Sequence, residues 1–389
     1  MAWRSARTPR SVCHCFYYKI GGKSMGKREL LIIVAFVAVG AIAYQLTAPA
    51  ATGTTSWSLG DFFKTARREM RGNPGRGTFV HKATIDAPPA LREVRLVLLQ
   101  GTVRIVGEAR DTIEYEFTVN STGPDDAGAV ALAKQTVIEP DNLADALILR
   151  ARYPEPASQT AVMVMRVPAR MVVRVESSRG FTISNVAAVQ AEGNRGDVTL
   201  TGIAGAITGA HQDGDFKVTG AKSVKLRLLR SQNTFTKITD GVVLDVRDGD
   251  TTVSDSAGAL EVDETRDEVT ITGHRGTITV RGTDGRVTIQ QPTAETRVDT
   301  RRAEVELQLD RAVTATILTT DEPLRLLMTG TPSLVLDAGA TDAAIQATDF
   351  NLTPVSTESH ARLTHTFGSG GARITLRNTR GDIILRKSQ

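Results

Sequence analysis

The chain has few aromatic side chains and almost no cysteine, and both shortages exclude kinds of protein. Its 389 residues include 11 Phe, 5 Tyr, 2 Trp and only two cysteines, Cys13 and Cys15. Because no cysteine follows Cys15, a disulfide framework is excluded for the body of the chain. The Cys13-x-Cys15 pair lacks the second ligand pair of a zinc finger, so we predict no metal site there.

The excess of positive charge is confined to the first 24 residues. The formal net charge is +4, but residues 1–24 contain five basic residues and no acidic one. Without them the acidic residues outnumber the basic ones by one. We interpret residues 1–24 as a spurious or disordered extension before a true start at Met25; a real cytoplasmic extension is the alternative. Charge therefore predicts no nucleic-acid partner.

A hydrophobic run follows Lys27 and Arg28. It begins at Leu30, ends at Tyr44 and carries no charge. If the run is extended to Leu46, it would span about 25 Å as a helix, which is enough to cross a slightly thinned bilayer. We predict a signal anchor over residues 25–48, although residues 48–50 (Ala-Pro-Ala) also fit a cleavage site.

The position of the basic residues predicts an orientation for this anchor. They precede the run, so the N-terminus is expected in the cytoplasm and the β-domain outside it, in the periplasm or at the cell surface. The lipid bilayer is thus one predicted partner. Residues 49–78 are expected to form a linker with a short amphipathic helix over residues 61–71.

Residues 79–176 show the alternation of apolar and polar side chains that is typical of strands. Short runs of this kind, bounded by Gly, Pro or Asn, predict a β-rich cap region. One helix is expected over residues 125–134, which begin with acidic residues after Pro124. The strand runs lie at residues 94–98, 103–105, 113–117, 147–149, 162–167 and 172–175.

From residue 177 to the C-terminus a short glycine motif repeats. Gly-Asp-Val-Thr-Leu at 196–200 returns in related form at 214, 249 and 285, and equivalent positions fall at 196, 214, 232, 249, 267, 285 and 303. A second series of equivalent positions lies between those of the first. In both series the interval near position 249 is one residue shorter than the other intervals. The glycines predicted to form repeat corners are Gly196, Gly214, Gly249, Gly258, Gly276, Gly285 and Gly381.

A fixed period of this length predicts a parallel β-solenoid of about 18 residues per coil. Scarce aromatics agree with a thin coil filled by aliphatic side chains. Inward residues are expected to be Val198, Leu200, Phe216, Val218, Val269, Ile271, Val287, Ile289, Val305 and Leu307. The expected outward column is Thr199, Lys217, Phe235, Thr252, Thr270, Thr288 and Glu306. Residues 79–176 and the irregular tail from residue 323 would cover the two ends.

These motifs resemble those of the bacterial putative-adhesin family, an adhesin-like β-strand repeat domain of unknown function. The residues concerned are an early Gly-Thr-Val-Arg-Ile strand at 101–105, the strand pair at 164–175, the repeats and a closing Gly-Asp-Ile-Ile-Leu at 381–385. The resemblance covers about residues 80–389. It implies a right-handed β-solenoid in an exported or membrane-anchored protein, and it implies no catalytic residue.

Several features could carry chemistry, and each has a plainer structural interpretation. The Asp-Gly-Asp corners at 213–215 and 248–250 are similar to calcium-binding corners but lack the full nonapeptide, so turn chemistry is favoured. Thr252, Thr270 and Thr288 would form a ladder that suits ice or sugar hydroxyls, although Thr is common on solvated strands. Histidines are scattered, and no phosphate loop, nucleophile elbow or dinucleotide motif is present.

We therefore expect no enzyme, no cofactor and no catalytic residue. The predicted function is a non-enzymatic, membrane-anchored, extracytoplasmic protein with a structural, adhesin-like or interaction role at the bacterial envelope, whose partner is an envelope protein or polysaccharide. The first alternative is a self-assembling envelope scaffold built end to end. The second is a carbohydrate-active β-helix enzyme, which would need clustered carboxylates with Lys or Arg on one face.

Overall fold

The computed structural model describes residues 74–98, 100–177, 179–330 and 332–388. The predicted extension 1–24, the anchor from Leu30 to Tyr44 and the helix at 61–71 lie outside these residues. Within the described ranges no helix is long and apolar enough to cross a membrane. The unit Arg71–Gln389 is compact, and it alone is described below.

Most of this unit is β-sheet, which confirms the all-β prediction. One helix, α3 (Asp126–Gln135), lies within one residue of its predicted position, with the Asp125 carboxylate accepting a hydrogen bond from the Gly128 N–H. The first strands are β1 (Gly75–Asp86), β2 (Glu93–Leu98), β3 (Gly101–Glu108), β4 (Thr112–Gly123), β5 (Val137–Asn142), β6 (Ala146–Arg152), β7 (Gln159–Pro168) and β8 (Val172–Ser177).

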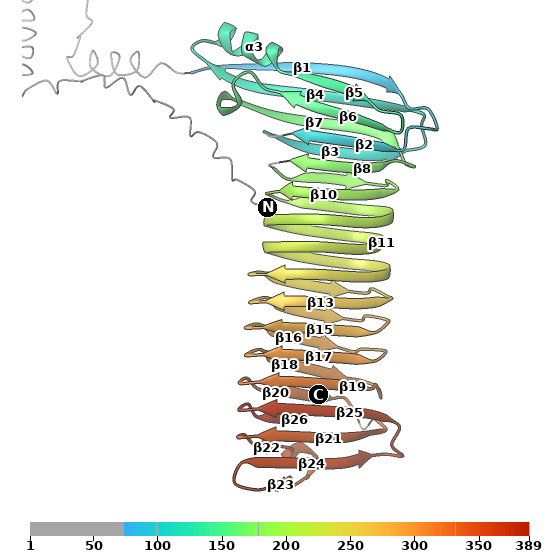
Figure 1. Cartoon of the computed structure of the whole chain (residues 1–389), viewed down its shortest axis with the longest axis vertical. Coiled ribbons are helices and arrows are strands. Elements are labelled where there is room, and N and C mark those ends of the chain that lie inside the picture. The colour runs from blue at the N-terminus through green and yellow to red at the C-terminus, as the bar shows by residue number, and fades with distance from the viewer. Residues whose placement is uncertain (1–73, 99, 178, 331, 389) are drawn as a thin grey trace, which may run out of the picture. The chain divides into compact units, whose positions relative to one another are not determined.

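The following strands stack as parallel coils, which Figure 1 shows as a ladder from β10 down to β20. They are β9 (Phe181–Ser184), β10 (Ala188–Asn194), β11 (Val198–Arg247), β12 (Asp250–Ser254), β13 (Ala259–Thr265), β14 (Glu268–Thr272), β15 (Ile278–Thr283), β16 (Arg286–Gln290), β17 (Thr296–Arg301), β18 (Glu304–Leu309), β19 (Ala315–Thr320) and β20 (Leu324–Met328). The 50 residues of β11 wind through several coils.

Two parallel ladders run through the coils. One joins β13, β15, β17 and β19; the other joins β12, β14, β16, β18 and β20. Successive partners such as Thr252, Thr270 and Thr288 are 18 residues apart. The period read from the sequence is therefore the length of one coil, whereas the hand of the coils stays a prediction.

The shortened coil lies one turn earlier than the sequence spacing suggested. Phe235 pairs with Val253, and Thr234 pairs with Thr252, so Thr234 belongs to the outward column. Phe235 was predicted to point outward, and this was wrong: it is fully buried and its ring lies 6.3 Å from that of Phe216. The repeat position was aligned on Gln232, one residue after Ser231, which lies opposite Gly249; a shift of one residue in a strand reverses every side chain.

The N-terminal strands extend the same sheet and then close it. β9 pairs with β3, β3 with β7, β7 with β4, and β4 with β1, the last two pairings being antiparallel. Helix α3 packs on this end, where a Cβ on Gly77 would come within 2.2 Å of the Val130 nitrogen. The first strand begins at Gly75, so residues 75–78, which were assigned to the linker, belong to the cap.

The C-terminal end is closed in a similar way. It contains β21 (Leu334–Thr341), β22 (Ile345–Gln346), β23 (Val355–Ser356), β24 (His360–Phe367), β25 (Ala372–Thr379) and β26 (Ile383–Lys387). β25 continues the parallel ladder below β19, but β24 is antiparallel to both β21 and β23. Antiparallel strands thus interrupt the parallel stacking at both ends.

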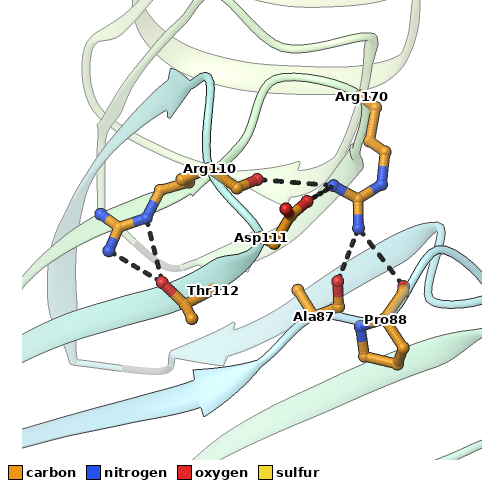
Figure 2. A network of polar contacts seen from close by, with 6 residues as sticks. All are labelled: Ala87, Pro88, Arg110, Asp111, Thr112 and Arg170. Atoms are coloured by element: carbon orange, nitrogen blue, oxygen red, sulfur yellow. Dashed lines mark hydrogen bonds and ion pairs between the residues drawn. The ribbon is translucent and has the colours of Figure 1, made fainter.

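An arginine ties three turns of the cap together (Figure 2). The Arg170 Nη2 donates to the carbonyl oxygens of Ala87 at 2.6 Å and Pro88 at 3.3 Å. Its Nη1 reaches the Arg110 carbonyl and the Asp111 carboxylate at 3.5 and 3.4 Å. One planar guanidinium therefore joins carbonyl groups of turns outside the strand ladders, and of these the Pro88 carbonyl also accepts from the Leu91 N–H at 2.9 Å.

The core is one continuous column of aliphatic side chains. Every residue predicted to point inward is fully buried. Adjacent coils stack these side chains directly above one another, so the apolar interior extends from the cap to the C-terminal strands.

Candidate functional site

One corner of the solenoid carries an alternating column of aspartate and arginine. All of its members adopt positive φ, between 50° and 73°. The column runs Asp213, Arg230, Asp248, Arg266, Asp284, Arg302, Asp321 and Arg380. Left-handed backbone is unfavourable for arginine, so the turn imposes this conformation on it.

Each arginine in the column pairs with the aspartate that precedes it. The Nε of Arg230 lies 2.7 Å from Asp213, and the corresponding distances for Arg266 to Asp248 and Arg302 to Asp284 are both 2.5 Å. A second nitrogen, Nη2, completes a two-pronged contact in each case. The Arg380 Nε pairs with Asp321 at 2.6 Å. The corner is therefore an ion-pair ladder that joins neighbouring coils in twos.

These pairs account for the corners that resemble calcium sites. Hydrogen bonds from Arg230 and Arg266 lower the pKa values of Asp213 and Asp248. Both carboxylates are thus bound to guanidinium groups of the next coil. Among the described residues, no group of three His, Cys, Asp or Glu side chains is arranged to hold a metal ion.

The predicted corner glycines serve two geometric needs. Gly196, Gly214, Gly258 and Gly276 have positive φ. At Gly249, Gly285 and Gly381 the reason is close packing, since a Cβ would lie 2.1 to 2.3 Å from a carbonyl oxygen of the neighbouring coil. Glycine at these positions allows the coils to approach one another.

Two carboxylates lie on the inner side of the same corner. Glu264 at the end of β13 and Asp267 in the following turn are 3% and 2% exposed. The Asp267 N–H donates to the Glu264 Oε2 at 3.4 Å. The Glu264 Oε1 and both carboxylate oxygens of Asp267 have no hydrogen-bond partner of normal geometry. Burial raises the pKa of each of these carboxyls to about 7.

One flat face carries two parallel columns of hydroxyl side chains. In the first, Thr182 pairs with Thr199, and Thr234, Thr252, Thr270 and Thr288 follow one another. In the second, Ser184 pairs with Thr201, and Thr236, Ser254, Thr272 and Gln290 follow one another. Neighbouring coils are about 4.8 Å apart and the two columns about 7 Å apart, as β geometry dictates.

This hydroxyl face, defined by the two columns, continues into the cap. Thr182 pairs with Arg104 of β3, which pairs with Val164 of β7. A shallow hollow there is lined by Lys82, Thr84, Glu114, Glu116, Val164 and Arg166. Lys82 and Glu116 form an ion pair at 2.9 Å. Along the coils the two hydroxyl columns lie beside a charged column on the same face (Asp250, Glu268, Arg286 and Glu304), and the charge continues at the cap.

The opposite face brings together charged residues that the sequence did not single out. Lys225, Arg227, Asp245 and Asp263 line a shallow hollow with Thr208 and Val243. The Arg227 Nε lies 3.2 Å from Asp245, and Asp263 follows Asp245 in register on the next coil. The signal in the sequence that could have found them is the 18-residue spacing of Arg227, Asp245 and Asp263.

Comparison with known proteins gives little further guidance. No protein-family model matches the chain, and no curated protein gives a significant match. A putative cell adhesion protein from Clostridium sporogenes is 10% identical over 80% of this chain and 100% of its own, with a TM-score of 0.19. A putative adhesin from Bacteroides fragilis is also 10% identical, over 81% and 99%, with a TM-score of 0.20. The resemblance to the putative-adhesin family stays a prediction.

Proposed function

We propose that this chain is a non-enzymatic β-solenoid, anchored in a bacterial membrane by residues 30–44, that contacts hydroxyl-rich polymers of the cell envelope through its hydroxyl face. The observation that carries this proposal is the alignment of two hydroxyl columns along consecutive coils. Hydroxyl groups both donate and accept hydrogen bonds, so a regular array suits a repeating polysaccharide. The anchor and the location rest on the sequence pattern alone.

The hydroxyl face is rigid and already partly paired. The Thr236 and Ser254 hydroxyl groups lie 3.1 Å apart, and the Thr272 hydroxyl donates to Gln290 at 3.3 Å. The Thr side chains of the first column are half-buried between neighbouring rungs, except Thr182, which is exposed. Binding would therefore require little ordering of side chains, which lowers its entropic cost.

A sedimentation assay with insoluble cell-wall polysaccharide tests the contact surface. The full chain in detergent should sediment with the polysaccharide, and Thr270→Glu should weaken this by about tenfold or more, because it places a charge in the middle of the hydroxyl face. Thr279→Glu is the matched control, since Thr279 lies on β15 of the opposite ladder. Equal sedimentation of both variants would exclude the hydroxyl face as the contact surface.

Membrane fractionation tests the anchor separately. The full chain should remain in the membrane pellet after a high-salt wash, and deletion of residues 30–44 should release it. Recovery of a processed soluble form of the unmodified chain would contradict the anchor without affecting the polysaccharide contact.

A carbohydrate-active enzyme is the second candidate, favoured by the hollow that contains Lys225, Arg227, Asp245 and Asp263. Carboxylates beside basic groups on one solenoid face fit a polysaccharide lyase or hydrolase. Incubation of the full chain with acidic and neutral polysaccharides, followed by reducing-end analysis, tests this. Turnover that is lost in Asp245→Asn but kept in Asp299→Asn would support the enzyme and exclude the non-enzymatic proposal.

An end-to-end scaffold would need a free strand edge at one end of the stack. Among the described strands, β1 pairs with β4 alone. The Asp126 carboxylate of α3 accepts from the Arg76 N–H at 2.9 Å, so the helix occupies one backbone donor of β1. Electron microscopy of the purified chain at high concentration separates the two cases, because filaments would support the scaffold and single particles would not.

A further inference from the structure

The inner side of the corner around β13 holds a cluster of polar side chains within an otherwise apolar column. Its five members are at most 5% exposed. They are Ser231, Asn233, Thr251, Glu264 and Asp267. The Asn233 Nδ2 donates to the Thr251 hydroxyl at 3.1 Å, so part of the cluster is internally paired. A buried polar cluster of this kind persists only when its groups are satisfied.

The next coil is shaped to receive the Glu264 carboxylate. A Cβ on Gly282 would lie 2.0 Å from the Glu264 Oε1, and one on Gly285 would lie 2.7 Å from its Oε2. Any other residue at position 282 would therefore occupy the space that the carboxyl group fills. The two glycines make Glu264 part of the packing between the coils.

Among the unpartnered atoms of the cluster, hydrogen-bond acceptors outnumber donors. The Glu264 Oε1, both Asp267 oxygens and the Asn233 Oδ1 have no hydrogen-bond partner of normal geometry, and all four are acceptors when the carboxylates are ionised. The Ser231 hydroxyl, also unpartnered, can supply a single donor. Protonation of a carboxyl group adds one O–H donor. Two protons would thus provide the donors that the ionised cluster lacks.

We propose that Glu264 and Asp267 form a pH-operated latch, in which the protonated pair holds its corner of the solenoid closed over Gly282 and Gly285 and ionisation of the pair opens it. The moving element is the turn between β13 and β14. Its closed form is held by the Arg266 N–H, which donates to the Thr283 carbonyl at 2.9 Å, and by the Glu268 N–H, which donates to the Gly249 carbonyl at 3.1 Å.

The carboxylates around the latch oppose ionisation of the pair, as burial does. Asp284 and Asp267 oppose ionisation of Glu264, and Asp248 and Asp250 oppose ionisation of Asp267. The Asp267 N–H, the Thr251 hydroxyl and the Gly249 backbone favour the charged forms, but less than burial opposes them. Arg266 does not neutralise the pair, since its guanidinium is engaged by Asp248 outside.

The sign of the pH effect follows from these pKa values. Both carboxyls have a pKa of about 7 in the closed form, against ordinary values of 4.5 for Glu and 3.8 for Asp. The closed form therefore binds more protons than the open form between about pH 4 and pH 7. The opening equilibrium constant should rise with pH through this window, by about tenfold per pH unit for each carboxyl, and level off above it.

Two buried histidines change stability with pH in the opposite sense. Burial lowers the pKa values of His211 and His274, so their contribution to stability falls as the pH decreases below 6.5. His211 also lies near Asp197 and Asp213, and His274 near the Gly258 carbonyl. Because both histidines are retained in a carboxyl variant, the difference between that variant and the unmodified chain cancels their effect.

Hydrogen exchange of the full chain at pH 5 and pH 8, corrected for the intrinsic rate at each pH, tests the latch. Peptides that cover residues 259–286 should lose protection by at least tenfold at pH 8 in the unmodified chain. The double variant Glu264→Gln, Asp267→Asn should show no loss of protection at pH 8, while Glu261→Gln, on the exposed side of the same strand, should behave as the unmodified chain.

Peptides from β19, where no carboxylate is buried, provide an internal reference. Equal protection of residues 259–286 at both pH values in the unmodified chain, or an equal loss in the double variant, would overturn the latch. If the double variant does not fold, the single variants Glu264→Gln and Asp267→Asn test the latch. Each should remove about half of the pH dependence of protection on a logarithmic scale. If neither variant reduces this pH dependence, the proposal is refuted.

Discussion

The outer and inner sides of a single solenoid corner treat carboxylates in opposite ways. Outside, Asp248 and Asp284 are exposed and each receives a two-pronged contact from an arginine of the next coil, which lowers their pKa values. Inside, Glu264 and Asp267 have no arginine, and burial raises their pKa values to about 7. Solvent and a cationic partner, rather than the residue type, decide whether a carboxylate joins coils or opposes their closure.

A new carboxylate placed elsewhere in the interior should have the largest effect. Ile271 is fully buried on β14 and has no glycine opposite it that would make room for a carboxyl group. Ile271→Asp should lower the free energy of unfolding by about 3–5 kcal/mol or prevent folding, because it loses apolar burial and adds an unpaired polar group. Urea unfolding measures this. Thr270→Asp, on the exposed side, should change stability by less than about 1 kcal/mol.

Filling the space beside the latch should have the next largest effect. A Cβ on Gly285 would lie 2.3 Å from the Asp267 carbonyl oxygen, which is backbone and cannot move away alone. Gly285→Ala should destabilise the chain by about 1–3 kcal/mol through overpacking. Gly339→Ala is the control, since its Cβ would make only an ordinary 3.4 Å contact with Arg377. Equal thermal shifts for both variants would contradict the role of close packing.

An arginine that donates to backbone carbonyls should contribute more to the free energy of unfolding than one that pairs with an exposed carboxylate. Arg170→Ala leaves the Ala87 carbonyl without the donor that Arg170 supplies, while the Pro88 carbonyl keeps the Leu91 N–H at 2.9 Å (Figure 2). We expect a loss of about 1–2 kcal/mol in urea unfolding, the range for hydrogen bonds from charged donors. Arg170→Lys should recover only part of it, because a lysine cannot place donors on several oxygens at once.

Removing one arginine of the ion-pair ladder should have the smallest effect on stability. In Arg266→Ala the Asp248 carboxylate loses its principal partner, and the pKa of Asp248, followed by NMR titration, should rise towards the ordinary value of 3.8. Because pairing lowers this pKa in the folded chain, the stabilisation is present above about pH 4 and is lost as the pH falls below it. An unchanged acid transition in Arg266→Ala would show that the ladder contributes nothing measurable.

The sequence predicted the fold to a considerable depth because the fold repeats. An 18-residue spacing and alternating burial follow from one strand geometry applied again and again, so errors average out over many coils. The helix after Pro124 was found because its cap residue and first turn are local signals. Phe235 was misplaced because one coil is a residue shorter than the others. The spacing of residues along the chain does not show which coil this is.

The charged corners show what a one-dimensional pattern leaves open. Asp213 and Asp248 fit a calcium corner in sequence, and only the stacked coils reveal that Arg230 and Arg266 reach them. Glu264 falls on the inward side of its strand, in phase with Leu260 and Val262, so the alternation points a carboxyl group into the core without showing what accommodates it. Its burial depends on Gly282, one coil further on, which admits its carboxyl group.

The strand content, the coil length and the side of each regular strand that faces the core depend on neighbours a few residues apart, so the amino-acid pattern was enough to predict them. The stacking of the coils instead sets which carboxylates are neutralised, which are buried and which hydroxyl groups align into columns. These properties depend on contacts between residues one coil apart, where a shift of a single residue exchanges the inside for the outside.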